Sequence, residues 1–230
     1  MIHMKITESD AEWTPRHLDL ISAGFVASLL ISNILATKLF QFGPAIFTAG
    51  ILVFPISYIF GDVLTEVYGF NRARRVIYFG LGANLFMTAA LGVAIALPPA
   101  QGWDMQREFA AVHSVLPRIV LASIIGYITG ELANSFVMSR MKLRTKGEKL
   151  WLRAVASTVV GQFLDTALFV LIAFAGSIPN GLVAAAIISG WLFKVVYEAA
   201  AMPVTYYMVR KLKALEGVDH FDRAQKLSIL

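Results

Sequence analysis

Two carboxylates lie one helical turn apart near the end of a long apolar stretch, in the run ISYIFGDVLTEVYGF at residues 56–70. Asp62 and Glu66 share one helical face with Tyr58, because positions i, i+4 and i+8 of a helix lie one above the other. A carboxylate is costly in an apolar environment unless it faces a polar cavity or a partner. The spacing therefore indicates a polar site suited to hydrogen-bond donors, a cation or protons.

A second polar stripe contains Gln162, Asp165 and Phe169. Asp165 lies near the middle of its apolar stretch, where an unpaired charge costs a few kcal/mol or more. It is therefore the strongest single candidate for a functional group.

A third stripe contains Trp191, Lys194 and Glu198 at helical spacing. The first apolar stretch adds Asn33 and, near its end, Lys38. Several stretches thus bring polar groups inward, and acids outnumber bases. We expect one polar cavity inside a helical bundle.

Structural roles compete for several of these residues. Lys38 can extend its ammonium to the membrane interface. Glu66 can pair with Arg72 or Arg75 at the headgroups. Lys194 and Glu198 can pair along one helix, which would only ease insertion.

The composition is that of an integral membrane protein. Of 230 residues, 57% are hydrophobic and only 15% are charged, and the mean hydropathy is +0.68. Apolar stretches of about 20 residues, the length that crosses a bilayer, recur along the chain. We predict an all-α bundle of six transmembrane helices at residues 18–212, followed by a cytoplasmic tail at 213–230. The expected spans are Leu18–Phe40, Pro44–Val67, Arg75–Leu97, Pro117–Met138, Val155–Ala175 and Gly181–Val209.

Lysine and arginine set the expected orientation. They gather between spans two and three, between spans four and five and in the tail, and they are sparse in the alternate segments. The positive-inside rule then places both termini in the cytoplasm, including residues 1–17, in which we expect no cleaved signal. The net charge of +5 therefore reflects anchoring to membrane lipid rather than binding of nucleic acid. Residues 98–117 are expected to form an interfacial loop with one short amphipathic helix.

The motifs that are missing limit the chemistry. The chain has no cysteine, which excludes thiolate chemistry, and no P-loop motif, so an ATP-driven step would need a partner. The four histidines lie outside the expected spans, and neither H-E-x-x-H nor G-x-S-x-G occurs. We expect no metal and no cofactor. A membrane-embedded enzyme that uses paired carboxylates remains the alternative of another class.

Small residues favour close helix packing. Gly126 and Gly130 form a G-x-x-x-G motif, and Ser157, Gly161 and Asp165 continue the same spacing in the next stretch. Such a face serves either packing within the chain or a homodimer, and the sequence leaves both open.

Three motifs occur in a characteristic order: SNILATKLF, then FPISYIFGDVLTEVYGFNRARR, then STVVGQFLDTALFVLIAFAG. With KVVYE and the following Pro203, they resemble the VUT family of queuosine precursor transporters. The resemblance covers all six expected spans. It implies a carrier in the inner (cytoplasmic) membrane for 7-cyano-7-deazaguanine and 7-aminomethyl-7-deazaguanine, small-molecule precursors of the tRNA nucleoside queuosine. It also implies a six-helix fold similar to the substrate-binding subunits of energy-coupling-factor transporters.

Such a cargo suits the candidate residues. A deazaguanine presents an N1–H and an amine side by side, and one carboxylate accepts both bonds. Asp165 and Glu198 are the first candidates for this edge, and Asp62 and Glu66 are candidates for a cytoplasmic gate. Donors for the ring carbonyl are Asn33, Lys38, Gln162 and Lys194, and aromatic faces for the flat ring are Phe54, Tyr58, Phe169 and Trp191.

The expected mechanism is alternating access around a site near the middle of the membrane. The energy source stays open between a downhill gradient and proton coupling. The runner-up is a substrate-binding subunit that docks on a partner of the energy-coupling-factor type and takes up a vitamin or another heterocycle.

Overall fold

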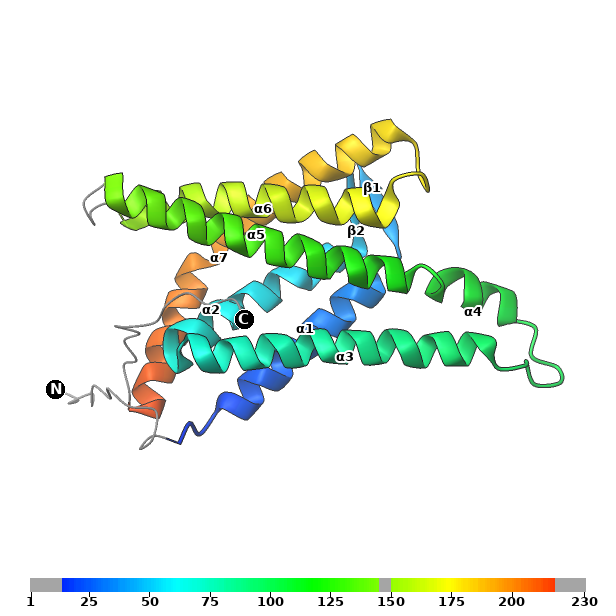
Figure 1. Ribbon diagram of the computed structural model, residues 1–230, viewed down its shortest axis with the longest axis horizontal. Coiled ribbons are helices and arrows are strands. Elements are labelled where there is room, and N and C mark those ends of the chain that lie inside the picture. Colours follow the sequence, from blue (N-terminus) through cyan, green and yellow to red (C-terminus); the bar gives the residue numbers. More distant parts are fainter. Residues whose placement is uncertain (1–13, 145–149, 218–230) are drawn as a thin grey trace.

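The computed structural model describes residues 14–144 and 150–217, which form a mostly helical bundle with one β hairpin (Figure 1). Some side chains inside the helices also lie outside the described set, among them Tyr58, Asp62, Glu66 and Glu131. The elements in chain order are α1 (Leu18–Leu35), β1 (Leu39–Phe42), β2 (Ala45–Thr48), a 3-10 turn η1 (Ala49–Leu52), α2 (Phe54–Tyr68), α3 (Phe70–Ala96), α4 (Gln106–His113), α5 (Leu116–Arg144), α6 (Leu150–Phe174) and α7 (Asn180–Glu216).

Five helical segments of the described chain are long and apolar enough to cross a membrane. They are Leu18–Leu35, Arg72–Ala96, Gln106–Gly130, Val155–Phe174 and Asn180–Glu216. The prediction of an all-α membrane protein is confirmed as a class of fold, with five such helices described rather than the six that were predicted. The short helix α4 also appears in the loop where a short helix was predicted.

The region of the first two predicted spans differs from the prediction. Helix α1 ends at Leu35 rather than Phe40, and α2 has only 15 residues, so it falls short of membrane length. Between them β1 pairs with β2 in antiparallel register, with Phe42 opposite Ala45. Gly43 provides the positive φ of 57° that a two-residue hairpin turn needs. Pro44 is incompatible with a continuous helix through this segment.

Helices α5 and α6 lie side by side along most of their length (Figure 1). Glycines allow this approach, because a Cβ atom on Gly130 would lie 2.8 Å from the carbonyl oxygen of Gly161. A Cβ atom on Gly126 would lie 2.8 Å from the carbonyl oxygen of Asp165. The G-x-x-x-G face therefore packs within the chain, which answers the question that the sequence left open for this face.

Among the residues that the structure describes, two hydrophobic clusters hold the bundle. One joins α1, α2, the start of α3 and the end of α7, and includes Phe25 and Val209. The other joins the hairpin, α5, α6 and the start of α7, and includes Ile46 and Ala186. Along α7, Lys194 lies between the residues of the two clusters. Polar side chains therefore gather at the level between two apolar layers.

A buried carboxylate ties three helix ends together. Glu216 at the end of α7 accepts a hydrogen bond from the Tyr68 hydroxyl at the end of α2, at 3.0 Å. It also accepts the backbone N–H groups of Arg16 and His17, just before α1, at 2.9 Å each. The start of α1 and the ends of α2 and α7 thus lie at one end of the bundle.

The close contact of α5 and α6 gives a first prediction. Gly130→Ala should lower the stability by about 1–3 kcal/mol, because the new methyl group has to push two backbones apart. Thermal unfolding of the purified protein in detergent measures the effect. Gly82→Ala on α3 is the matched control, since no atom lies within 4 Å of its added Cβ. Equal melting temperatures for the two variants would contradict the packing described for α5 and α6.

Candidate functional site

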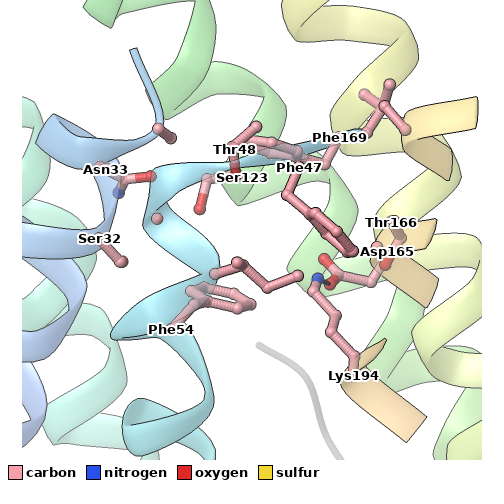
Figure 2. A pocket seen from close by; sticks show the side chains of 16 residues that line it. Ser32, Asn33, Phe47, Thr48, Phe54, Ser123, Asp165, Thr166, Phe169 and Lys194 are labelled. Carbon is pink, nitrogen blue, oxygen red and sulfur yellow. Dashed lines mark hydrogen bonds and ion pairs between the residues drawn. The ribbon is translucent and has the colours of Figure 1, made fainter. Parts of the chain in front are cut away.

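A cavity opens at the level between the two hydrophobic clusters (Figure 2). Its volume is about 50 Å³, inside about 600 Å³ of empty space that includes the open mouth. The wall comes from α1, the hairpin, η1 and α2 on one side and from α5, α6 and α7 on the other. Its polar side chains are Ser32, Asn33, Thr48, Ser123, Asp165, Thr166 and Lys194, and its aromatic ones are Phe47, Phe54 and Phe169.

An ion pair crosses one side of this cavity. Lys194 Nζ on α7 lies 2.6 Å from Asp165 Oδ2 on α6, and the two side chains are only 10% and 7% exposed. The ammonium group also lies 4.6 Å from the centre of the Phe54 ring on α2 (Figure 2). Lys194 thus makes its ion pair between helices, whereas the sequence left open a pair with Glu198 on its own helix.

The opposite wall is fixed by an amide pair. Asn33 Nδ2 on α1 donates to Asn84 Oδ1 on α3 at 2.6 Å, and Asn84 Nδ2 donates to the Gly80 carbonyl at 2.9 Å. Asn84 is only 2% exposed. It does not line the cavity, but it orients Asn33, whose amide oxygen faces the cavity side in Figure 2.

Thr166 is a lining residue that the sequence reasoning missed. Its side chain is buried, and among the residues that the structure describes its hydroxyl has no hydrogen-bond partner. Such a group in a cavity wall is ready to bond a ligand or water. Its only signal in the sequence is its position next to Asp165.

The hairpin supplies Phe47 and Thr48, which the sequence reasoning also missed because it expected a helix there. Phe47 rests edge-on against Phe193 of α7, with ring centres 5.9 Å apart. The backbone N–H of Ile46 donates to Ser189 Oγ at 3.4 Å. The run LFQF-GP-AIFT, two strand-like tetrads around a Gly-Pro turn, was the available signal.

The predicted site residues divide into three groups. Asn33, Phe54, Asp165, Phe169 and Lys194 line the cavity. Lys38, Gln162, Trp191 and Glu198 are described but are not among its lining residues. Tyr58, Asp62 and Glu66 lie outside the described side chains.

The polar residues beside the cavity bind other helices. Glu198 accepts hydrogen bonds from Thr158 Oγ1 at 3.0 Å and from Gln162 Nε2 at 3.2 Å, both on α6. Trp191 Nε1 donates to the Val159 carbonyl at 3.0 Å, and its ring contacts Phe163. In the part of the chain that the structure describes, no three His, Asp or Glu residues come together as a metal site.

The ion pair gives a second prediction. Lys194→Met should destabilise the protein by about 3–5 kcal/mol, because it leaves the buried charge of Asp165 without its cation. The double variant Asp165→Asn/Lys194→Met should recover at least half of that loss, since it removes both charges. Melting temperatures in detergent of the natural protein, the two single variants and the double variant form a double-mutant cycle. A double variant less stable than Lys194→Met would show that the pair does not act as a unit.

Comparison with known proteins identifies the family. A family model described as "Putative vitamin uptake transporter" matches residues 48–208. A "Probable queuosine precursor transporter" of Bacillus subtilis (strain 168) is 28% identical over 160 residues, which are 69% of this chain and 70% of that protein. A protein of the same name from Haemophilus influenzae is 27% identical over 128 residues, and the "Queuosine precursor transporter" of Escherichia coli (strain K12) is 27% identical over 127 residues. Each of these two alignments covers 55% of this chain, and they span 52% and 55% of the relatives.

No solved structure matches the chain. The family model, in contrast, spans more than half of it and includes the residues of α2, α5, α6 and α7 that form the cavity. The chain therefore belongs to the VUT family of vitamin uptake transporters, and it is a transporter rather than an enzyme.

Proposed function

We propose that this protein carries queuosine precursors, 7-cyano-7-deazaguanine or 7-aminomethyl-7-deazaguanine, across the inner membrane, and that the cavity holding Asp165 and Lys194 is the binding site. The names of the relatives support this class of cargo. The observation that carries the proposal is the buried ion pair, 2.6 Å between Nζ and Oδ2, in the wall of the cavity.

The pair matches one edge of a 7-deazaguanine. This edge presents an amine, the N1–H and the ring carbonyl in a row, that is, two donors beside one acceptor. The Asp165 carboxylate accepts the two N–H groups, and the Lys194 ammonium donates to the carbonyl. Acceptor and donor already lie side by side in the cavity wall, and the cargo replaces the direct contact between them when it binds.

The remaining wall suits a flat heterocycle. Phe47, Phe54 and Phe169 reach the cavity from three elements and offer apolar faces and edges to a ring. The Thr166 hydroxyl, which has no partner among the described residues, supplies a further polar contact. A substituent at position 7 distinguishes the proposed cargo from guanine.

We also propose that the chain crosses the membrane six times, with both termini in the cytoplasm. Helix α2 of 15 residues spans about 22 Å, which is short of a hydrocarbon core of about 30 Å. The hairpin and η1 cover the part of the hydrocarbon core that α2 is too short to cross. Non-helical backbone is tolerated at this depth because the hairpin lines a cavity and is covered by α7. Arg72, Arg74 and Arg75 mark the end of α2 as the cytoplasmic side. The likeness to energy-coupling-factor subunits stays a prediction.

Binding tests the site directly. Purified protein in detergent should bind 7-cyano-7-deazaguanine or 7-aminomethyl-7-deazaguanine in the micromolar range or tighter, guanine at least 10-fold more weakly, and biotin not at all. Asp165→Asn should weaken binding at least 10-fold, because it removes the charge that accepts the two N–H groups. Asp104→Asn, an exposed loop carboxylate, is the matched control. Folded protein that binds no deazaguanine would refute the cargo assignment.

Transport by the isolated chain tests the mechanism. We expect protein reconstituted alone in liposomes to equilibrate a labelled deazaguanine without ATP, by alternating access around the cavity. Liposomes that contain Asp165→Asn should lose at least 90% of this uptake. Binding without any movement, restored by a partner complex and ATP, would instead favour the alternative of a substrate-binding subunit.

A further inference from the structure

A second, smaller cavity lies next to the first and contains Glu198. Its volume is about 10 Å³, room for about one water molecule, inside about 320 Å³ of empty space that includes its open surroundings. Pro55 and Ile59 of α2 form one wall, and Lys194, Glu198 and Ala201 are among the residues of α7 that form the other. These residues follow those of the first cavity along both helices, toward the end of the bundle where α2 and α7 meet at Glu216. That end is the cytoplasmic one in the proposed topology.

The two cavities share one partition. Lys194 lines both of them. Phe54 lines the first and its neighbour Pro55 lines the second, so the start of α2 also separates them. The Lys194 ammonium lies 4.6 Å from the centre of the Phe54 ring, and these two side chains lie along the lower edge of the first cavity in Figure 2. The Lys194 ammonium and the Phe54 ring therefore close the passage between the two cavities.

This partition has a way to open. The stem of a lysine is long and flexible, and its ammonium can exchange one carboxylate for another. Asp165 holds it now, and Glu198 lies one turn further along α7, in the wall of the second cavity. A cargo whose N–H groups bond Asp165 competes for the same oxygens that hold the ammonium. Its arrival therefore weakens the contact that keeps the partition closed.

We propose that Lys194 and Phe54 form the gate through which the cargo leaves the first cavity toward the cytoplasm, and that the second cavity lies on this exit path and widens when the gate opens. This inference rests on the proposed function. Glu198 receives the Lys194 ammonium when the gate opens, so it acts on the passage of the cargo rather than on its first binding. The molecule that passes the gate is the cargo of the first cavity, a flat heterocycle with a row of hydrogen-bond donors.

Cysteine labelling tests the gate without any need for cargo, because the natural chain has no cysteine. Ser123→Cys places a thiol in the first cavity and Ala201→Cys places one in the second. Inside-out vesicles are treated with a membrane-impermeant cationic thiosulfonate, which reaches only the cytoplasmic face. Ala201→Cys should react at least 10-fold faster than Ser123→Cys. Phe54→Ala should then raise the rate at Ser123→Cys at least 10-fold, and Phe54→Leu, which keeps more bulk, should raise it less.

Phe169→Ala is the matched control, because it enlarges the first cavity from a residue that does not line the second. It should leave the slow labelling of Ser123→Cys within about 2-fold of its rate in the otherwise unchanged chain. An unreactive Ala201→Cys would overturn the gate. So would a rate at Ser123→Cys that stays the same when Phe54→Leu or Phe54→Ala is added.

Glu198→Gln separates the gate from the site. Binding of the deazaguanine in detergent should stay within 3-fold of the natural protein, whereas liposome uptake should fall at least 10-fold. Normal uptake by Glu198→Gln would overturn the role of Glu198 and leave the first site standing. Failure of the natural protein to bind any deazaguanine would refute the proposed function instead, and the labelling result would still decide whether the partition opens.

Discussion

The ion pair between Asp165 and Lys194 is the interaction on which the middle of this bundle depends. Each of these charges alone is expensive between apolar layers, so each requires the other within reach. The pair joins α6 to α7, and the Phe54 ring beneath the ammonium adds α2 to the same junction. The ion pair thus joins α2, α6 and α7 at the height of the cavity, and polar ligands can compete for this contact. Elsewhere in the described chain, two hydrophobic clusters hold the helices by contacts that no polar cargo disturbs.

The position of Asp165 depends in turn on the glycines of α5. Gly126 and Gly130 let α5 approach the backbone of α6 so closely that the Asp165 backbone and side chain meet the α5 surface. The carboxylate is therefore supported from behind by a backbone and faces the cavity from a fixed place. A rigid pair of helices, α5 and α6, presents the acid, whereas the cation comes from α7, which contains Pro203 and bends along its course (Figure 1). The acid is thus on the stiffer side of the site and the cation on the more adaptable side.

The sequence predicted the class of the fold and singled out one acid of the candidate site, because both depend on local signals. Apolar length indicated the helices, and a carboxylate in mid-span is too costly to be accidental, which singled out Asp165. The sequence did not predict which helices face each other. The partner of Lys194 was therefore left open, Asn84 behind Asn33 was missed, and Glu198 was grouped with Asp165 although it lines the neighbouring cavity. The hairpin was missed for a different reason: its apolar strands fit a hydropathy window as well as a helix does, and only the Gly-Pro turn distinguished them.

A carrier has to change conformation both with its cargo and without it. Under the proposed function, this requirement gives Lys194 a second role, in the empty protein. An empty site with a bare carboxylate would resist burial, because nothing would offset the charge of Asp165 in the closed protein. The Lys194 ammonium occupies the carboxylate in the empty state, as the N–H groups of the cargo do in the loaded one. The Asp165 carboxylate is then paired in both states. The empty and loaded states therefore have similar electrostatic free energies, and neither is so stable that the carrier stops in it. Lysine suits this task better than arginine would, because a single-point ammonium leaves a carboxylate more easily than a bidentate guanidinium does.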